Sequence, residues 1–254
     1  MNLKGDSCRF LIIIPTFNES KNISILLSKL LEFRANRNDF RVLIVDDGSP
    51  DGTSGVAREM NLDWVSILER NEKRGLGSAY KAGFAWGNLG SYKYYVEMDA
   101  DGSHRVEDLS RLLDAEPTLD LVIGSRWIDG GHIVNWPRHR KWLSIGGNFY
   151  ARKMLGAKVK DSTSGFRRIK CDALNEINLE GISSKGYGFQ IEVVSEFIAK
   201  GFTVSEIPIT FIEREYGTSK MTLEIALEAW VLVTKRSQLL SFRSRSLSRD
   251  KKAI

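Results

Sequence analysis

The strongest constraint on the fold is a repeated order of apolar segment, polar loop and amphipathic segment. Residues 9–14 form a continuous β-prone apolar run, and residues 23–31 follow with leucine and isoleucine at helical spacing. A continuous apolar run is typical of a strand covered on both faces of a parallel sheet. Further strands are predicted at 40–45, 65–68, 94–98 and 119–123, with a final pair at 202–211 bent at Pro208. The alternation predicts an α/β fold with a mostly parallel, twisted sheet flanked by helices.

Three of these predicted strands end at acidic loops, whose carboxylates are Glu19, Asp46, Asp47, Asp99 and Asp101. In a doubly wound sheet, the loops at the carboxyl ends of the strands converge on one crevice. Asp99 and Asp101 point the same way in an extended chain, and Gly102 allows a sharp turn after them. Paired carboxylates suit Mg²⁺ or Mn²⁺. The alternative is a solvated turn at the end of a strand.

The charge of the chain is unevenly distributed. The formal net charge is +5, and residues 235–254 carry seven of the 37 basic residues but one of the 32 acidic ones. Such a tail suits an anionic membrane surface or RNA, and a disordered solubilising end is the alternative. Cys8 and Cys171 form neither a CxxC nor a Cys/His cluster, which indicates a reducing compartment without a structural zinc site.

No signal peptide and no transmembrane span is expected, because the apolar stretch at 225–233 is far shorter than about 20 residues. Residues 1–220 are predicted to form the catalytic domain, and 221–254 an amphipathic helix with a basic tail. A helical stripe precedes the tail, formed by Leu223, Leu227, Trp230 and Val233. This order is typical of an interfacial helix, although the stripe could instead pack against the catalytic domain.

Four further sequence features each allow more than one interpretation. Gly75 and Gly77 precede a predicted helix, but Tyr80 occupies the last position of a GxGxxG motif, which argues against a Rossmann dehydrogenase. The turn at 46–49 could cap a helix as an Asx turn or bind a ribose or base. Three loop cations could neutralise a diphosphate or be solvated: Arg126, Arg214 and Lys220. Neither His104 nor His139 is assigned as a base.

Together these motifs resemble the family 2, GT-A-type glycosyltransferases, and within them the dolichol- or polyprenol-phosphate mannose synthases. The form of residues 98–104 and 135–137 is most similar to the actinobacterial polyprenol-phosphate mannose synthases. The matching segments cover residues 9 to about 221 in the family's order: 15–19, 46–53, 75–77, 98–104, 124–126, 136–137, 164–167, 185–190 and 214–220.

The resemblance implies a role for each matching residue. Donor contacts are implied at Pro15, Phe17, Glu19, Ile44, Asp46, Asp99, Ala100, Asp101, Arg126, Arg214 and Lys220. Catalytic roles are implied for Asp99, Asp101 and Arg126, and lipid-phosphate binding for Arg126, Arg140 and Ser144. Metal binding is implied at Asp99 and Asp101, with Ser103 at the position of a third ligand. Two residues depart from the family's pattern. Phe17 replaces the usual tyrosine, and Ser103 stands where some members have a metal-binding glutamine.

The implied reaction moves mannose from GDP-mannose to a polyprenyl (dolichyl-type) phosphate with inversion, using Mg²⁺ or Mn²⁺. The implied location is the cytoplasmic face of a membrane, with peripheral attachment to which a separate membrane-embedded protein could contribute. One alternative is the same fold with another donor, such as UDP-glucose. A second is a non-catalytic RNA- or membrane-binding protein, although acids in a groove repel nucleic acid, so no nucleic-acid partner is expected.

Overall fold

A seven-stranded sheet forms the centre of the computed structural model, which describes residues 8–156, 158–182, 184, 186–214 and 234. The strand order is β3-β2-β1-β4-β7-β5-β8, and β6 and β9 form a separate parallel pair. Within the large sheet, β7 runs antiparallel to both of its neighbours. The strands are β1 (Phe10–Thr16), β2 (Phe40–Asp46), β3 (Val65–Glu69), β4 (Tyr94–Glu97), β5 (Leu121–Ser125), β6 (His132–Val134), β7 (Arg167–Lys170), β8 (Val204–Pro208) and β9 (Thr210–Ile212).

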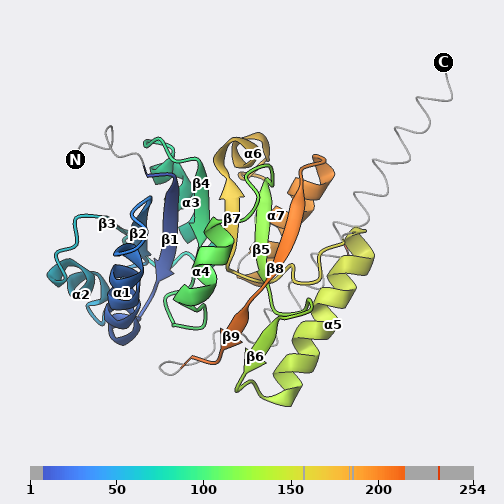
Figure 1. The fold of residues 1–254 in the computed structure, drawn as a ribbon, viewed down its shortest axis with the longest axis horizontal. Coiled ribbons are helices and arrows are strands. Elements are labelled where there is room, and N and C mark those ends of the chain that lie inside the picture. Colours follow the sequence, from blue (N-terminus) through green and yellow to red (C-terminus); the bar gives the residue numbers. More distant parts are fainter. Residues whose placement is uncertain (1–7, 157, 183, 185, 215–233, 235–254) are drawn as a thin grey trace.

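Helices cover both faces of this sheet (Figure 1). One face carries α1 (Ser20–Arg34), α2 (Thr53–Glu59) and α4 (Val106–Leu113), and the other carries α3 (Leu76–Gly87), α6 (Cys171–Glu176) and α7 (Tyr187–Ala199). The long helix α5 (Arg138–Leu155) runs along the edge of the molecule beside β6. Its inner side reaches α7, where Ala151 packs with Ile191.

The side chains of β1 divide the core into two layers. Phe10, Ile12 and Ile14 pack under α1 and α4, whereas Leu11 and Ile13 pack under α3 and α7. All five are fully buried. Alternation of side chains along a strand explains this division, because successive residues point to opposite faces of a sheet. An uninterrupted apolar run is therefore needed to fill both layers at once.

The functional edge of the sheet follows from its strand order. The chain runs outward from β1 to β2 and β3, and then returns to β4 on the other side of β1. All four strands are parallel, so their carboxyl ends lie at the same edge. In open α/β sheets, ligands bind at such a switch point, where the loops after the two strands part.

The mostly parallel sheet flanked by helices is confirmed, and so is the break in the last strand pair at Pro208. The polar, turn-rich sequence of residues 161–168 did not predict a strand, yet Arg167 begins β7 in the middle of the sheet. In the described part of the chain, no helix combines the length and the apolar character needed to cross a bilayer. Three predicted features lie outside the described residues: the boundary at residue 220, the stripe at 223–233 and the basic tail at 235–254.

Two helical glycines should respond oppositely to alanine. A Cβ at Gly83 in α3 would lie 2.6 Å from Cγ2 of Ile13, whereas a Cβ at Gly146 in α5 would meet nothing within 4 Å. We expect Gly83→Ala to lower the free energy of unfolding by about 1–3 kcal/mol through overpacking. Gly146→Ala should raise it by up to about 1 kcal/mol, because alanine favours the helix. Urea denaturation of both variants measures the difference, and an equal response would contradict the close packing of α3 on β1.

Candidate active site

A cavity of about 320 Å³ lies at the carboxyl ends of β1 and β4. The loops after β1, β2 and β4 contribute to its wall, together with the start of α3 and the start of α7. A smaller cavity of about 170 Å³ lies between α1 and the loop after β4, and it shares Asp101 and Arg214 with the larger one. Of the residues implied by the sequence, the larger cavity is lined by Pro15, Phe17, Glu19, Asp99, Ala100, Asp101 and Arg214.

The turn after β2 separates the roles of its two aspartates. Asp46 is buried and holds the turn together, because its carboxylate accepts hydrogen bonds from the Thr16 hydroxyl at 2.8 Å and the Ser49 backbone N–H at 2.9 Å. Asp47, not Asp46, lines the cavity, where its carboxylate accepts a hydrogen bond from Arg70 Nε at 2.6 Å. The structure therefore contains the side-chain-stabilised turn that was one of the two alternatives, but this turn does not cap α2, whose N-cap residue is Gly52. Asp46 as a donor contact stays a prediction.

Ile44 is also placed away from the cavity. Its side chain is fully buried in the core layer under α1, opposite Ile14 in the β1–β2 pairing. A donor contact there stays a prediction.

On the cavity wall itself, the ammonium of Lys73 lies 4.3 Å from the centre of the Phe17 ring. This cation–π contact joins the loop before α3 to the loop after β1.

Asp99 and Asp101 come together at the exit of β4, as the sequence predicts. Gly102 has a φ of +75°, which provides the sharp turn after them. The side chain of Asp99 is 34% exposed, and it faces the cavity. Asp101 is buried, and its two oxygens are engaged differently: Oδ1 accepts a hydrogen bond from the Ser103 backbone at 3.0 Å, and Oδ2 lies 3.0 Å from the Arg214 guanidinium.

The charge of Asp101 is stabilised by its surroundings. Burial alone would raise the pKa of this carboxyl, but the Arg214 guanidinium and the hydrogen bonds from Ser103 hold its pKa below the ordinary value. Ser103 also donates its hydroxyl hydrogen bond to Asp101, and it does not line the larger cavity. Among the described residues, no group of three or more carboxylate, imidazole or thiol side chains could hold a metal ion. A third ligand at Ser103 stays a prediction.

His104 is placed as a buried packing residue. Its ring stacks on Phe166 at 5.0 Å between centroids, and its Nδ1 accepts a hydrogen bond from the backbone N–H of Asp99 at 3.1 Å. Burial is the largest influence on this imidazole and lowers its pKa to about 4. His104 is therefore neutral at pH 7 and fixes the loop that carries the carboxylates.

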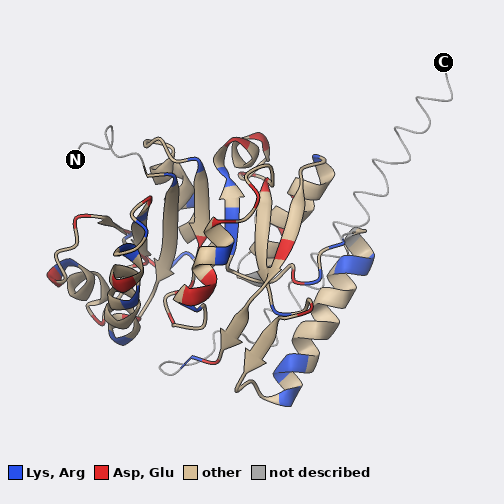
Figure 2. Ribbon diagram, viewed as in Figure 1, with Lys and Arg blue, Asp and Glu red and all other residues tan. Residues whose placement is uncertain are grey.

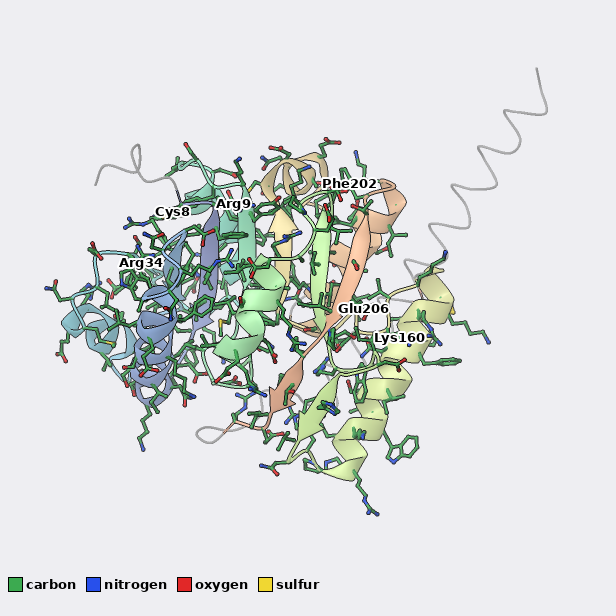
Figure 3. The ribbon with its side chains drawn as sticks, viewed as in Figure 1. Cys8, Arg9, Arg34, Lys160, Phe202 and Glu206 are labelled. Atoms are coloured by element: carbon green, nitrogen blue, oxygen red, sulfur yellow. The ribbon has the colours of Figure 1, made fainter. Side chains whose placement is uncertain are left out.

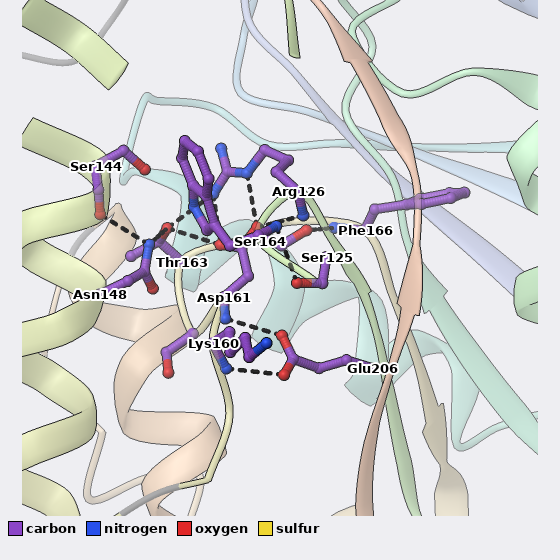
Figure 4. A network of polar contacts seen from close by, with 12 residues as sticks. Ser125, Arg126, Ser144, Asn148, Lys160, Asp161, Thr163, Ser164, Phe166 and Glu206 are labelled. Atoms are coloured by element: carbon purple, nitrogen blue, oxygen red, sulfur yellow. Dashed lines mark hydrogen bonds and ion pairs between the residues drawn. The ribbon is translucent and has the colours of Figure 1, made fainter. Parts of the chain in front are cut away.

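Arg126 is held by a buried ion pair that the sequence did not reveal (Figure 4). Its Nε and Nη2 atoms donate to the two carboxylate oxygens of Asp161, at 2.7 and 2.6 Å. Nη2 also donates to the Thr163 hydroxyl at 2.9 Å. Burial alone would raise the pKa of Asp161, but Arg126 lowers it below the ordinary value. Glu206 fixes the backbone at Asp161 by accepting hydrogen bonds from the N–H groups of residues 160 and 161.

Arg140 and Ser144 lie one turn apart on the inner side of α5, and both are buried. The Arg140 guanidinium donates to Glu213 at 2.6 Å and lies 4.2 Å from the Trp136 ring. Arg126 approaches the same ring, at 5.4 Å, so two cations flank one indole. Two buried N–H donors here, Nε of Arg140 and Nε1 of Trp136, have no hydrogen-bond partner among the described residues. Lys220 lies outside the described residues.

A comparison with known protein families decides the identity of the fold. The sequence profile of glycosyl transferase family 2 matches residues 11–177, more than half of the chain. The chain belongs to glycosyl transferase family 2. The matched range contains β1 through β7 and therefore the switch point with its carboxylates, which confirms the family resemblance seen in the sequence.

Two relatives of this family 2 glycosyltransferase match nearly its whole length. One is an undecaprenyl-phosphate mannosyltransferase of Micrococcus luteus, 48% identical over 89% of this chain and 93% of the relative. Another is a polyprenol monophosphomannose synthase of Mycolicibacterium smegmatis, 47% identical over 84% of this chain and 81% of the relative.

A solved structure shares the fold at low sequence identity. It is a mannosyltransferase from Pyrobaculum calidifontis in complex with GDP-Man and Mn²⁺, 19% identical, with a TM-score of 0.54. The alignment covers 83% of this chain and 58% of that longer protein. The GT-A glycosyltransferase fold is thereby confirmed for the family 2 chain.

Several residues of the candidate site of this glycosyltransferase were missed by the sequence analysis. Asp161 and Thr163 stand in the turn-rich segment, but nothing in it indicated a partner for Arg126, 35 residues earlier. Gln190 lines the cavity and lies in the family-matching segment 185–190, to which the sequence analysis assigned no role. Lys73 was not identified from the sequence, and its place on the cavity wall depends on the turn before α3.

Proposed function

We propose that this family 2 glycosyltransferase transfers mannose from GDP-mannose to a polyprenyl phosphate and forms polyprenyl-phosphate β-mannose. The observation that carries the proposal is the position of Asp99 and Asp101 on a cavity at the β1–β4 switch point, with Arg214 paired to Asp101. Close carboxylates and a guanidinium suit a sugar nucleotide, whose diphosphate is polyanionic. The mannosyltransferase names of the two relatives support mannose as the sugar and a polyprenyl phosphate as the acceptor.

The residues present fit a divalent cation. Asp99 opens into the cavity and Asp101 is ionised beside it, so the pair supplies the hard oxygen donors that Mg²⁺ or Mn²⁺ prefers. We infer that Asp99 and Asp101 hold this cation; the solved mannosyltransferase in complex with Mn²⁺ supports a divalent cation in this fold. When bound, it would supply positive charge that stabilises the departing diphosphate.

The second group of cations suits the acceptor phosphate. Arg126 and Arg140 approach the Trp136 ring, and Nε of Arg140 and Nε1 of Trp136 are buried N–H donors with no acceptor in the part of the chain that the structure describes. A buried donor without a partner costs free energy, which a phosphate oxygen would recover. We infer that Arg140, Ser144 and Trp136 bind the lipid phosphate and that Arg126, fixed by Asp161, adds positive charge. Lys220 is proposed to contact the donor from outside the described residues.

The proposed transfer reaction does not require a strong general base. A phosphate monoester has a second pKa of about 6 and is mostly a dianion at pH 7, so it needs no deprotonation before attack. The buried, neutral His104 is consistent with a site that lacks a strong base. An acceptor oxygen forms the new bond to the anomeric carbon as the bond to GDP breaks, and GDP leaves with the electron pair. Attack from the opposite side inverts the configuration, and Arg214 can then pair with the diphosphate that leaves.

A polyprenyl acceptor places the reaction at a membrane. We propose peripheral attachment at the cytoplasmic face, where nucleotide sugars are available. Residues 221–254 are proposed to contribute to this attachment. A membrane-embedded protein partner stays a prediction, since no described residue bears on it.

A transfer assay with labelled donors tests the function. We expect GDP-mannose, with Mg²⁺ or Mn²⁺, to label polyprenyl phosphate at least tenfold faster than UDP-glucose or GDP-glucose does. A site that hydrogen-bonds particular hydroxyl or base groups discriminates against analogues that leave them unpaired. Chelation by EDTA should abolish transfer, and Mn²⁺ should restore it. Faster transfer from UDP-glucose would contradict the donor, and undiminished transfer in EDTA would contradict the cation.

A further inference from the structure

The side-chain amide of Gln190 lies on the cavity wall without a hydrogen-bond partner. Gln190 stands near the start of α7, is 1% exposed and lines the larger cavity. Its Oε1 and Nε2 atoms are both buried, and neither forms a hydrogen bond within the described part of the chain. Packed side chains fill the space between the sheet and its helices (Figure 3), where an unpaired polar atom costs free energy. A buried, unpaired amide beside a cavity therefore indicates a polar ligand group.

Arg167, at the start of β7, holds the backbone that carries this amide. Its Nη1 donates to the carbonyl oxygen of Gln190 at 2.9 Å, and its Nε donates to the carbonyl oxygen of Ser164 at 2.7 Å. Figure 2 shows β7 as a basic strand in the middle of the sheet. Burial raises the pKa of the Glu97 carboxyl to about 7, and Arg167 and Gln190 oppose this rise. An amide has two N–H donors and an acceptor oxygen, so its interaction with Glu97 leaves hydrogen-bonding capacity for a ligand.

The order of the strands indicates which part of the donor reaches Gln190. The loops that line the cavity follow β2, β1 and β4, in that order across the sheet, and β7 is the next strand. Because β7 runs antiparallel to β4, its first residue lies at the same edge as the end of β4. With the diphosphate at Asp99 and Asp101, the donor can extend from there toward β1 and β2 in one direction and toward β7 in the other.

The acceptor site decides between these two directions. Arg126, proposed to contact the acceptor phosphate, follows β5, which is the strand beyond β7. The sugar passes from the diphosphate to the acceptor phosphate, so it must lie between them, at the start of β7. Gly165 lines the cavity there and lacks a side chain, and a Cβ at this position would lie 3.4 Å from Oδ1 of Asp99. The nucleoside is left with the loops after β1 and β2.

We propose that Gln190 is a specificity-determining residue whose side-chain amide hydrogen-bonds a hydroxyl group of the donor sugar. The inference deepens the proposed function and rests on it for the direction in which the donor lies. A neutral amide matches a neutral hydroxyl, whereas a diphosphate is matched by cationic groups such as Arg214. A site that hydrogen-bonds one hydroxyl rejects an analogue without it, because the buried amide is then left unpaired.

Calorimetric titration with GDP-mannose and with GDP, each with Mn²⁺ and without acceptor, tests the contact. Gln190→Met nearly keeps the length of the side chain, removes the amide and leaves the backbone carbonyl that Arg167 holds. We expect GDP-mannose to bind about tenfold more weakly, as the loss of a hydrogen bond to a buried group predicts, and GDP to bind within about twofold of wild type. Equal losses for the two ligands, or no loss for either, would overturn the proposal.

Ser195→Ala is the matched control for this substitution. Ser195 is buried on the same helix and its Oγ is also unpaired among the described residues, but it does not line the cavity. Its replacement should leave the binding of both ligands unchanged. A loss of GDP-mannose binding as large as that of Gln190→Met would show that any polar group removed from α7 has this effect, and would overturn the proposal.

Deoxy donors identify the hydroxyl that is bound. GDP-mannose analogues, each without a different hydroxyl group of the mannose, should lower kcat/KM of the wild-type protein. In Gln190→Met the penalty for one of these hydroxyls should shrink at least threefold, because its partner is already absent. Gln190→Asn keeps an amide but shortens its reach, and it supports the same comparison if the methionine variant fails to fold. Penalties that all stay as in the wild type would overturn the proposal.

Failure of this inference and failure of the proposed function give different results. If the wild-type protein bound UDP-glucose and not GDP-mannose, the proposed function would fail, and titration of the same variants with UDP-glucose and UDP would still decide the role of Gln190. If the wild type transferred mannose while Gln190→Met kept every penalty, the function would stand and the role of Gln190 would be refuted. Binding of neither sugar nucleotide would overturn both.

Discussion

Asp101→Asn should lower kcat for mannose transfer by about 10³-fold or more, equivalent to about 4 kcal/mol of transition-state stabilisation. The amide keeps the shape of the side chain but removes the charge that pairs with Arg214 at 3.0 Å and that we propose holds the cation. The measurement is the steady-state rate of label transfer at saturating GDP-mannose and Mn²⁺. Calorimetric titration with Mn²⁺ and GDP should show weaker binding in the same variant.

Two further substitutions separate charge loss from general damage. Asp114→Asn removes a carboxylate whose side chain is 59% exposed after the end of α4, and it should leave kcat unchanged. His104→Asn keeps an acceptor for the Asp99 backbone N–H and should cost less than tenfold, because the histidine is already neutral. A near wild-type rate for Asp101→Asn, or an equal loss in His104→Asn, would contradict the assignment of the carboxylates.

Asp161→Ala should lower the free energy of unfolding by about 3–5 kcal/mol, because it removes the buried carboxylate that pairs with the Arg126 guanidinium. Asp161 is fully buried and accepts hydrogen bonds from both the side chain and the backbone of Arg126. Urea denaturation followed by circular dichroism measures the loss. Removal of one partner of a buried pair costs far more than loss of a surface ion pair.

A double variant gives the matched control for that pair. Arg126→Met/Asp161→Leu should be more stable than Asp161→Ala, since it removes both charges and fills the space with apolar atoms. The double variant should nevertheless lose transfer activity if Arg126 contributes charge to the acceptor phosphate. Retained activity would show that Arg126 serves only the fold.

The parallel half of the sheet was predictable because one physical rule dominates it. Strands β1, β2 and β4 are buried on both faces, so their sequences are mostly apolar, and they can be recognised without knowing which strands they pair with. Strand β7 breaks the rule. Arg167 and Arg168 are almost fully buried, and their guanidinium groups donate to backbone carbonyl oxygens that include those of the distant Gln190 and Ala115. Arg167 also lies 3.9 Å from the buried carboxylate of Glu97. A pattern based on hydrophobicity cannot distinguish such arginines from those of a loop.

The same distinction applies to the site. Asp99 and Asp101 were predictable, because their spacing and their place after a strand fix where they point. Arg126 was identified as a cation, but its partner Asp161 is reached only through the fold. Asp46 and Asp47 are neighbours with nearly identical sequence context, and the structure alone distinguishes the one that ties the turn from the one on the cavity wall.

The antiparallel strand in the middle of the sheet affects how the protein can be synthesised. Residues 94–97 find their second hydrogen-bonding neighbour at residues 167–170, at least seventy positions later. A nascent chain that has emerged only as far as β5 therefore presents β4 as an open edge, onto which another chain could add a strand. Translation through this interval is the period in which such a protein most needs a chaperone, and fragments that end before Lys170 should aggregate.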